Sequence, residues 1–292
     1  MRPNGSDSNG LPLSPGLRQS RLVFERMSRY IGRLARSSAS NDVHRFRTNS
    51  RRVEALISEL VPETRNKKKL LKLLSKLRKK AGKVRDLQVQ IAFMTNLKLP
   101  DRQNHREQFL DGLHAEHGRR SRKLARSFEA ETVKDLRKRL RRAQSEMKLD
   151  GVDPLKRAFE RLPKPGQLPI SEQNLHTYRI AGKHARYLAE LVADSAEGRF
   201  MVLELKRAQD VIGEWHDVLK LKEAAEKRFG SVRDSALVSA LQNISRARFR
   251  RAVRALLAAV SAISEHRNSA LRSEVGRKGA ETESRSAQAA VA

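Results

Sequence analysis

Two stretches of the chain repeat a pattern of histidine, arginine and further basic residues. The first set is His44, Arg47, Arg51 and Arg52, and the second set is His176, Arg179, Lys183 and Arg186. An α-helix turns once in about 3.6 residues, so steps of three and four residues place each set on one stripe. Guanidinium groups bind phosphate oxygens in pairs, and an imidazole adds a charge that depends on pH. The pattern therefore indicates a surface that binds anions.

The two histidines have an ordinary interpretation as well as a functional one. A lone histidine on a helix is more often a surface residue or a core residue with its hydrogen bonds made than a ligand. His44 and His176 recur at matching positions, each three residues before an arginine, and this recurrence favours phosphate contact. Because a phosphate raises the pKa of a nearby histidine, we expect binding to tighten as the pH falls toward 6.

A second pair of segments supports an internal duplication. The segment from Gly82 to Asp86 aligns with that from Gly213 to Asp217, and the spacing from histidine to aspartate differs by one residue between the copies. Each half then supplies a His/Arg helix followed by a long helix that bears Gly-x-x-x-Asp. We expect Asp86 and Asp217 to form salt bridges that orient neighbouring cations, without a catalytic role.

Further basic residues follow the long helices. One stripe, away from the apolar seam of its helix, consists of Lys72, Lys76, Lys79 and Lys83. Arg207 aligns with Lys76 across the repeat and joins the predicted phosphate ligands. A separate stripe consists of Lys134, Lys138, Arg141 and Arg142. For this last stripe the sequence leaves open an auxiliary role in binding and simple solvation.

Composition restricts the classes of function. The 292 residues carry a formal net charge of +29, which favours a polyanionic partner. The absence of cysteine excludes disulfides, thiolate metal sites and thiol nucleophiles. No apolar run reaches the ~18 residues of a membrane span, and the N-terminus lacks the apolar region of a signal peptide. We therefore expect a cytoplasmic protein.

Hydrophobic periodicity predicts helices almost throughout and an all-α fold. The expected helices cover 18–37, 42–60, 63–97, 153–162, 171–194, 197–229 and 232–265. A basic segment at 101–149 is expected to be helical, with a possible break at Gly112, Gly118 or near Ser127. We expect disordered tails at 1–17 and 267–292, and the Pro-rich stretch 163–170 as the best internal boundary.

Four motifs in order resemble the CHAD family, the conserved histidine α-helical domain. They are V-H-x-x-R-x-x-x-R-R at 43–52, K-V-R-D-L-Q-V at 83–89, L-H-x-x-R-I-A-G-K-x-x-R-Y at 175–187 and Q-D-x-I-G-E-x-x-D at 209–217. The resemblance implies a domain over 18–266, made of two antiparallel four-helix bundles, about 18–150 and 151–266, related by a pseudo-twofold axis. It also implies a basic central groove that binds inorganic polyphosphate, and an association of some members with polyphosphate granules.

Other functions have weaker support in the sequence. A nucleic-acid protein would suit the charge, but only 4% of the residues are aromatic and no helix-turn-helix is recognisable. A polyphosphate-processing enzyme would need a metal-binding carboxylate cluster, and the acids are scattered. His114 and His117, with His105 upstream, lack a third ligand at suitable spacing. We therefore expect no cofactor, no metal and no catalysis, with polyphosphate or polyphosphate-metabolising enzymes as partners.

Overall fold

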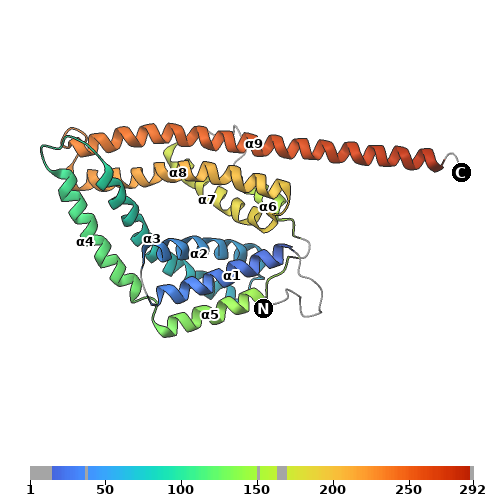
Figure 1. Ribbon diagram of the computed structural model, residues 1–292, viewed down its shortest axis with the longest axis horizontal. Helices are drawn as coiled ribbons and strands as arrows, with labels where there is room; N and C mark the ends of the chain where they lie inside the picture. Colours follow the sequence, from blue (N-terminus) through green and yellow to red (C-terminus); the bar gives the residue numbers. More distant parts are fainter. Residues whose placement is uncertain (1–14, 37–38, 150–151, 163–169, 290–292) are drawn as a thin grey trace.

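The protein is built from α-helices (Figure 1). The computed structural model describes residues 15–36, 39–149, 152–162 and 170–289, and for 270, 271 and 273–289 it describes the backbone alone. The elements are α1 (Pro15–Leu34), α2 (Ser40–Leu60), α3 (Arg65–Asn96), α4 (His105–Ala125), α5 (Ala130–Ser145), α6 (Pro154–Glu160), α7 (Glu172–Ala189), the 3₁₀ helix η1 (Glu190–Val192), α8 (Ala196–Phe229) and α9 (Ala236–Ala289). The described residues contain no strand, which confirms the all-α prediction.

Local sequence explains most of the helix boundaries. Pro15 opens α1, since a proline at the first helical position loses no intrahelical hydrogen bond. The Thr64 hydroxyl accepts a hydrogen bond from the Lys67 amide and caps α3. At α7 the Ser171 and Asn174 side chains each accept a hydrogen bond from the other residue's backbone amide, in a complete capping box. The sequence predicted the start of this last helix.

The basic segment predicted at 101–149 divides into two helices. α4 ends at Ala125 and α5 begins at Ala130, so the break lies near Ser127, one of the three positions considered. Gly112 and Gly118 lie inside α4. The turn allows the buried Phe128 ring to pack edge-on against Phe46, with ring centroids 5.1 Å apart.

The first bundle consists of α1, α2, α5 and the N-terminal part of α3. Its core includes Phe24, Phe46, Leu56, Leu74 and Leu136. α1 packs on α2 and α5, and α3 also packs on α2 and α5, so the four helices enclose this core. The apolar positions recur every three or four residues, which buries one stripe of each helix.

The second bundle consists of α6, α7, α8 and α9. One part of its core surrounds Trp215, and the other gathers around Leu188 and Met201. The pseudo-twofold relation between the bundles stays a prediction. The division of the chain near residue 150 also stays a prediction. Residues 150–151, and the predicted boundary stretch at 163–169, lie outside the described part.

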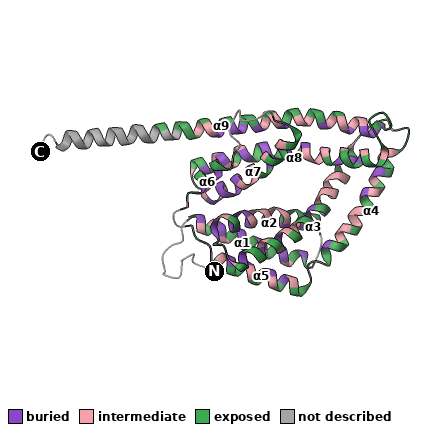
Figure 2. Ribbon diagram, turned by 180° about the vertical axis from the view of Figure 1, so that it is seen from behind, coloured by how far each residue is buried: buried purple, intermediate pink, exposed green. Residues whose placement is uncertain are grey.

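The bundles meet in several places. α2 packs on α7, α3 packs on α8, and α1 packs on η1. The C-terminal end of α3 contributes to a cluster that we name the apolar joint. It consists of Met94 from α3, Phe109 and Leu113 from α4, Val218, Leu221 and Ala225 from α8, and Leu237, Val238 and Leu241 from α9. Figure 2 shows buried residues along the faces on which these helices meet.

The last helix differs from the sequence prediction. It was expected to end near residue 265 and to be followed by a tail, whereas α9 continues to Ala289 and extends past its partner helices (Figure 1). No proline follows residue 265, and two glycines at about 1 kcal/mol each do not prevent a helix. At the N-terminus, 15–17 belong to α1 and not to a tail, and 1–14 lie outside the described residues.

Candidate functional site

A cavity of about 280 Å³ lies where α2 and α3 face α7. It is lined by Arg51, Glu54, Arg78, His176, Arg179, Ile180, Lys183, His184 and Tyr187. We name this cavity, together with the adjacent Arg47, the central basic site. It joins residues from both predicted His/Arg stripes, which lie more than 100 positions apart in the sequence.

Amphipathic helices position these side chains. α2 buries Val43, Phe46 and Val53 in the first bundle, and α7 buries Leu175, Ala185 and Leu188 in the second. Each helix therefore turns its basic stripe away from its own core. Because α2 packs on α7, the two stripes face one another across the site.

Burial and neighbouring like charges strongly lower the pKa values of two basic side chains in the site. Burial, and then the charges of Arg179, Arg51, Arg47 and Arg186, lower the pKa of Lys183 to about 6. Burial and the neighbouring Arg47 lower the pKa of Arg51 to about 10. Because its pKa is about 6, Lys183 is neutral for most of the time at pH 7. Neither Lys183 nor Arg51 forms a hydrogen bond or an ion pair with the described residues.

The buried Arg179 occupies the middle of the cation cluster. Only 8% of its surface is exposed, and its Nε has no hydrogen-bond partner among the described residues. Burial lowers the pKa of Arg179, although the carboxylates of Asp217 and Asp86 act in the opposite direction. An orphaned, buried guanidinium N–H is costly in a folded protein, and an incoming anion would supply its missing acceptor.

The two aspartates lie beside the cations. Asp86 Oδ1 is 3.0 Å from Arg47 Nη2, which is the type of ion pair expected for an orienting residue. Asp217 Oδ1 lies 3.7 Å from His216 Nδ1, and its charge reaches Arg179. These two acids compensate only part of the positive charge around them.

The repeat histidines occupy similar electrostatic surroundings. Burial, and then the charges of Arg85 and Arg47, lower the pKa of His44. Burial and the neighbouring His216 lower the pKa of His176, whose ring stacks on that of His216 with centroids 5.2 Å apart. Both imidazoles are therefore predominantly neutral at pH 7 in the free protein, and an anion at the site would favour their protonation.

Two of the predicted ligands are engaged with the protein itself. Arg52 donates hydrogen bonds to Glu190 through Nε at 2.7 Å and through Nη2 at 3.1 Å. Arg186 Nε lies 3.5 Å from the same carboxylate. Glu190 begins η1, directly after α7, so Arg52 fastens α2 to the end of α7, and Arg186 pairs with the same carboxylate from within α7.

The predicted lysines of α3 do not line the central cavity. Lys76 lies in a different cavity of about 610 Å³ between α3 and α4. Lys72 and Lys83 are exposed, and Lys79 lies close enough to Glu54 to lower its pKa against the larger effect of burial. Arg207 pairs with Glu204 at 2.6 Å on the surface of α8.

The four basic side chains of the auxiliary stripe on α5 also lie in different surroundings. Arg141 lines a separate cavity between α1 and α5. Lys134 and Lys138 are exposed, and Arg142 pairs with Glu146 at 2.7 Å. These four side chains therefore do not form a single surface.

Sequence reasoning missed one pair in the central basic site. Arg78 of α3 donates to both carboxylate oxygens of Glu54 on α2, at 2.7 and 2.9 Å. Glu54 is three residues after Arg51, so it shares the stripe. That spacing was the available signal for an acid inside the site.

The three histidines considered as metal ligands do not share one set of neighbours, although burial, and then the charge of His114, lower the pKa of His117. His105 stacks on Phe229 and contacts Ser235 at 2.9 Å. His117 lies 3.4 Å from Gln88. Over the described ranges no group of three or more histidine, aspartate or glutamate side chains is arranged to hold a metal ion.

Comparisons with known proteins agree with the fold. The chain resembles the crystal structure of the CHAD domain from the plant Ricinus communis, with a TM-score of 0.58 and 16% identity, over 85% of this chain and 90% of that one. It also resembles PptA from Streptomyces chartreusis, with a TM-score of 0.60 and 15% identity, over 86% of this chain and 98% of that one. At such identities the likeness shows the fold alone.

The other comparisons concern sequence and membrane topology. No curated protein matches the chain. None of the helices in the described part combines the length and apolar character that crossing a membrane requires. The family model of the CHAD domain matches residues 19–226. That range spans most of the chain and contains both His/Arg stripes, so the protein belongs to the CHAD family.

Proposed function

We propose that the protein binds inorganic polyphosphate at the central basic site and that it does so without catalysis. One observation carries the proposal. The buried Arg179 and the half-buried Arg51 and Lys183, from two facing helices, line one cavity with no acid paired to any of them. Such an arrangement is unfavourable in the free protein and becomes favourable when an anion lies between the helices.

The chemistry of the site suits a phosphate chain. Polyphosphate carries about one negative charge per phosphate and offers no base edges to be read. Arginine forks bind its oxygens in pairs, and lysine supplies a movable point charge. The orphaned Nε of Arg179 gains an acceptor when a phosphate oxygen reaches it. Within the cavity lining, Tyr187 is the one aromatic side chain apart from the histidines, so no platform for stacking bases is present there.

The placement of the acids supports binding without turnover. Asp86 and Asp217 lie next to Arg47 and His216 respectively, where they orient cations. The residues of the site include no nucleophile with a general base beside it. In the cell such a protein would accompany polyphosphate in the cytoplasm, on granules of the polymer or beside the enzymes that metabolise it.

The test is a titration with polyphosphates of graded length. The double variant Arg47→Gln/Lys183→Gln removes two cations from the site, and Lys206→Gln/Arg207→Gln removes the same two residue types from the exposed surface of α8. A charged hydrogen bond contributes enough for about a tenfold change in affinity. We therefore expect about a hundredfold loss in the first variant, and a change of less than about threefold in the second.

Competition separates this function from nucleic-acid binding. Long-chain polyphosphate should resist displacement by duplex DNA or RNA at equal phosphate concentration. Displacement by either nucleic acid would contradict the proposal, as would an equal loss of affinity in both double variants. Release of orthophosphate with Mg²⁺ or Mn²⁺, abolished by Asp86→Asn and Asp217→Asn, would instead indicate an enzyme.

A further inference from the structure

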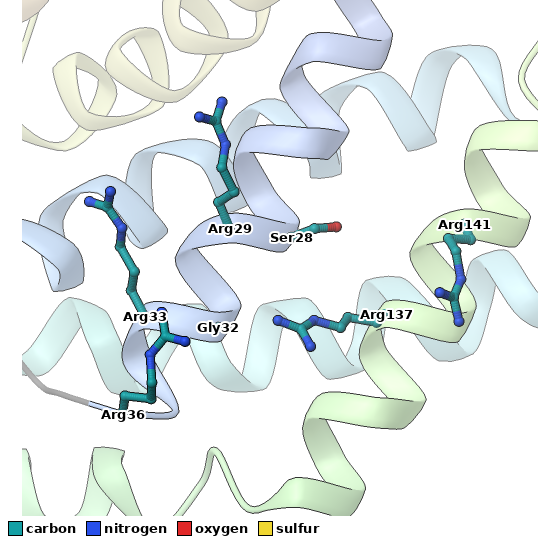
Figure 3. A pocket seen from close by; sticks show the side chains of 7 residues that line it. All are labelled: Ser28, Arg29, Gly32, Arg33, Arg36, Arg137 and Arg141. Atoms are coloured by element: carbon teal, nitrogen blue, oxygen red, sulfur yellow. The ribbon is translucent and has the colours of Figure 1, made fainter. Parts of the chain in front are cut away.

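Five exposed arginines line a cavity of about 590 Å³ between α1 and α5. Arg29, Arg33 and Arg36 come from α1 and its end, with Ser28 and Gly32, and Arg137 and Arg141 come from α5. In Figure 3 Arg137 extends toward α1, whereas Arg29 and Arg33 extend away from α5. We name this cavity the α1–α5 arginine site. Sequence reasoning selected one of its members, Arg141, and assigned it to a stripe that the structure divides.

The charge of this site is almost uncompensated. Arg33 Nη1 lies 3.3 Å from Asp42 Oδ1, and this is the one ion pair that the described residues form with any of the five arginines. A solvated helix surface ordinarily mixes acids with bases, as α5 does elsewhere, where Arg139 pairs with Asp135. The α1–α5 arginine site therefore keeps its guanidinium groups available for an external anion.

Gly32 leaves space for the guanidinium group of one arginine. Figure 3 shows Arg137 extending from α5 toward Gly32 on α1. A Cβ atom at position 32 would lie 2.6 Å from Arg137 Nη2, so any other residue there would displace the guanidinium. A glycine inside a helix costs about 1 kcal/mol relative to alanine. The fold accepts this cost at the point where the guanidinium rests against α1.

The residue types indicate the class of ligand. All five cations are arginines, whereas the exposed stripe of α3 is built from lysines. Arginine is more weakly hydrated than lysine, and its planar fork matches two oxygens of one phosphoryl group. A cavity surrounded by several such forks suits adjacent phosphoryl groups better than a lone carboxylate.

α2 and α3 contact α7 and α8, and α1 contacts η1, whereas α5 packs on α1 and α3. The α1–α5 arginine site lies at the C-terminal part of α1, where α1 faces α5. In Figure 1 α5 accordingly lies away from α7 and α8. An anion in the α1–α5 arginine site and an anion in the central basic site would therefore lie in separate cavities.

We infer that the α1–α5 arginine site is a second, independent binding site for condensed phosphate, and that the protein is bivalent. This inference rests on the proposed function, since it extends the same ligand class to another surface. A bivalent protein holds two segments of one long chain or joins two chains, and the second contact then benefits from a high effective concentration.

Calorimetric titration with tripolyphosphate tests the number of sites. Arg137→Glu/Arg141→Glu reverses two charges inside the cavity, and Lys134→Glu/Lys138→Glu makes the same change in charge on α5 at exposed positions outside its lining. We expect two bound tripolyphosphates per chain in the wild type and in the lysine variant, and one in the arginine variant. Thermal melting checks that each variant is folded.

The outcomes separate the two sites. Loss of the other bound tripolyphosphate in Arg47→Gln/Lys183→Gln would complete the expected pattern. A wild type with one bound ligand that the arginine variant retains would overturn the second site and leave the central one intact. If the wild type binds one tripolyphosphate and the arginine variant loses it, the ligand lies in the α1–α5 arginine site alone, and the proposed function of the central basic site is overturned. If the wild type binds no tripolyphosphate, both proposals are overturned. A length test follows: long-chain polyphosphate should raise light scattering of the wild type and not of Arg137→Glu/Arg141→Glu.

Discussion

Two of the contacts between the bundles are chemically opposite. At the apolar joint, buried side chains such as Leu221 and Leu237 pack together from α3, α4, α8 and α9. Where α2 meets α7, the facing side chains are cations that repel each other, and the pKa of Lys183 is lowered to about 6. One contact is favourable without any ligand, whereas the other needs one.

This difference shows how a protein of such high positive charge keeps a binding site open. The hydrophobic contribution of the apolar joint holds the bundles together at one end. The salt bridge from Arg52 to Glu190 fastens α2 to the end of α7. Between these attachments the cations of the central basic site are held close together in the absence of an anion.

The largest expected effect comes from weakening the apolar joint. Leu237 is fully buried, and Leu237→Ala should lower the free energy of unfolding by about 2–5 kcal/mol. Urea denaturation monitored by the fluorescence of Trp215, the one tryptophan, measures it. Leu70→Ala in the first bundle serves as a control of equal size. A cost below about 1 kcal/mol at Leu237 would contradict the role assigned to the joint.

The next effect comes from filling the charged contact. Polyphosphate at a hundredfold excess over its Kd should stabilise the folded protein by about 2.7 kcal/mol. The same ligand should stabilise Leu237→Ala as well, because that substitution leaves the cations in place. Melting curves with and without the polymer measure the shift, and Arg47→Gln/Lys183→Gln should show a smaller shift that comes from the α1–α5 arginine site alone. An equal shift in that variant would place the ligand elsewhere.

Replacing Lys183 should have opposite effects on stability and on binding. Lys183→Met replaces a half-buried side chain without an ion pair by an apolar one of similar length, so it removes the cost of desolvating an unpaired charge and should stabilise the folded protein. The same substitution should weaken polyphosphate binding about tenfold. Denaturation and titration of this variant measure both quantities. A less stable protein would show that Lys183 is better accommodated than the charge cluster implies.

Much of this arrangement can be predicted from the sequence, and the rest has a physical reason. Helical periodicity fixes which face of α2 carries Arg47 and Arg51, because the apolar Val43, Phe46 and Val53 on another face must enter a core. The repeat predicts that Arg179 and Lys183 play the same part on α7. Periodicity within one helix does not tell which distant acid an exposed arginine meets, so the engagement of Arg52 with Glu190 was not foreseen.

The same reasoning applies to the lysines and to the helix ends. Lys76 and Arg51 both follow basic stripes, but α3 turns Lys76 toward α4 and not toward α7. The rotation of a helix between two neighbours depends on both neighbours, and a single helical wheel contains neither. The extension of α9 to Ala289 was missed because polar composition was interpreted as a tail, although composition alone does not exclude a helix.

The smallest expected effect is the dependence of the free energy of unfolding on pH. It distinguishes the charged contact between α2 and α7 from a contact that only buries apolar surface. Lys183 has a folded pKa of about 6 and an unfolded value near 10.5. Between about pH 7.5 and 9 the unfolded chain therefore holds a proton that the folded chain lacks, so stability rises with pH, by at most about 1.4 kcal/mol per unit.

Between about pH 7.5 and 9 the other titrating groups near Lys183 contribute little to this slope. His44, His176 and His184, whose pKa values are lowered, are neutral there in both states, and Arg51, with a pKa of about 10, is mostly charged. Denaturation at several pH values should show the slope in the wild type and lose it in Lys183→Met. Polyphosphate should reverse the sign for binding, because an anion beside Lys183 restores its proton. Affinity then falls as pH rises, and calorimetry in buffers of different ionisation enthalpy should detect the proton taken up. A slope that persists in Lys183→Met would assign the titration to another group and remove this lysine from the account of the charged contact.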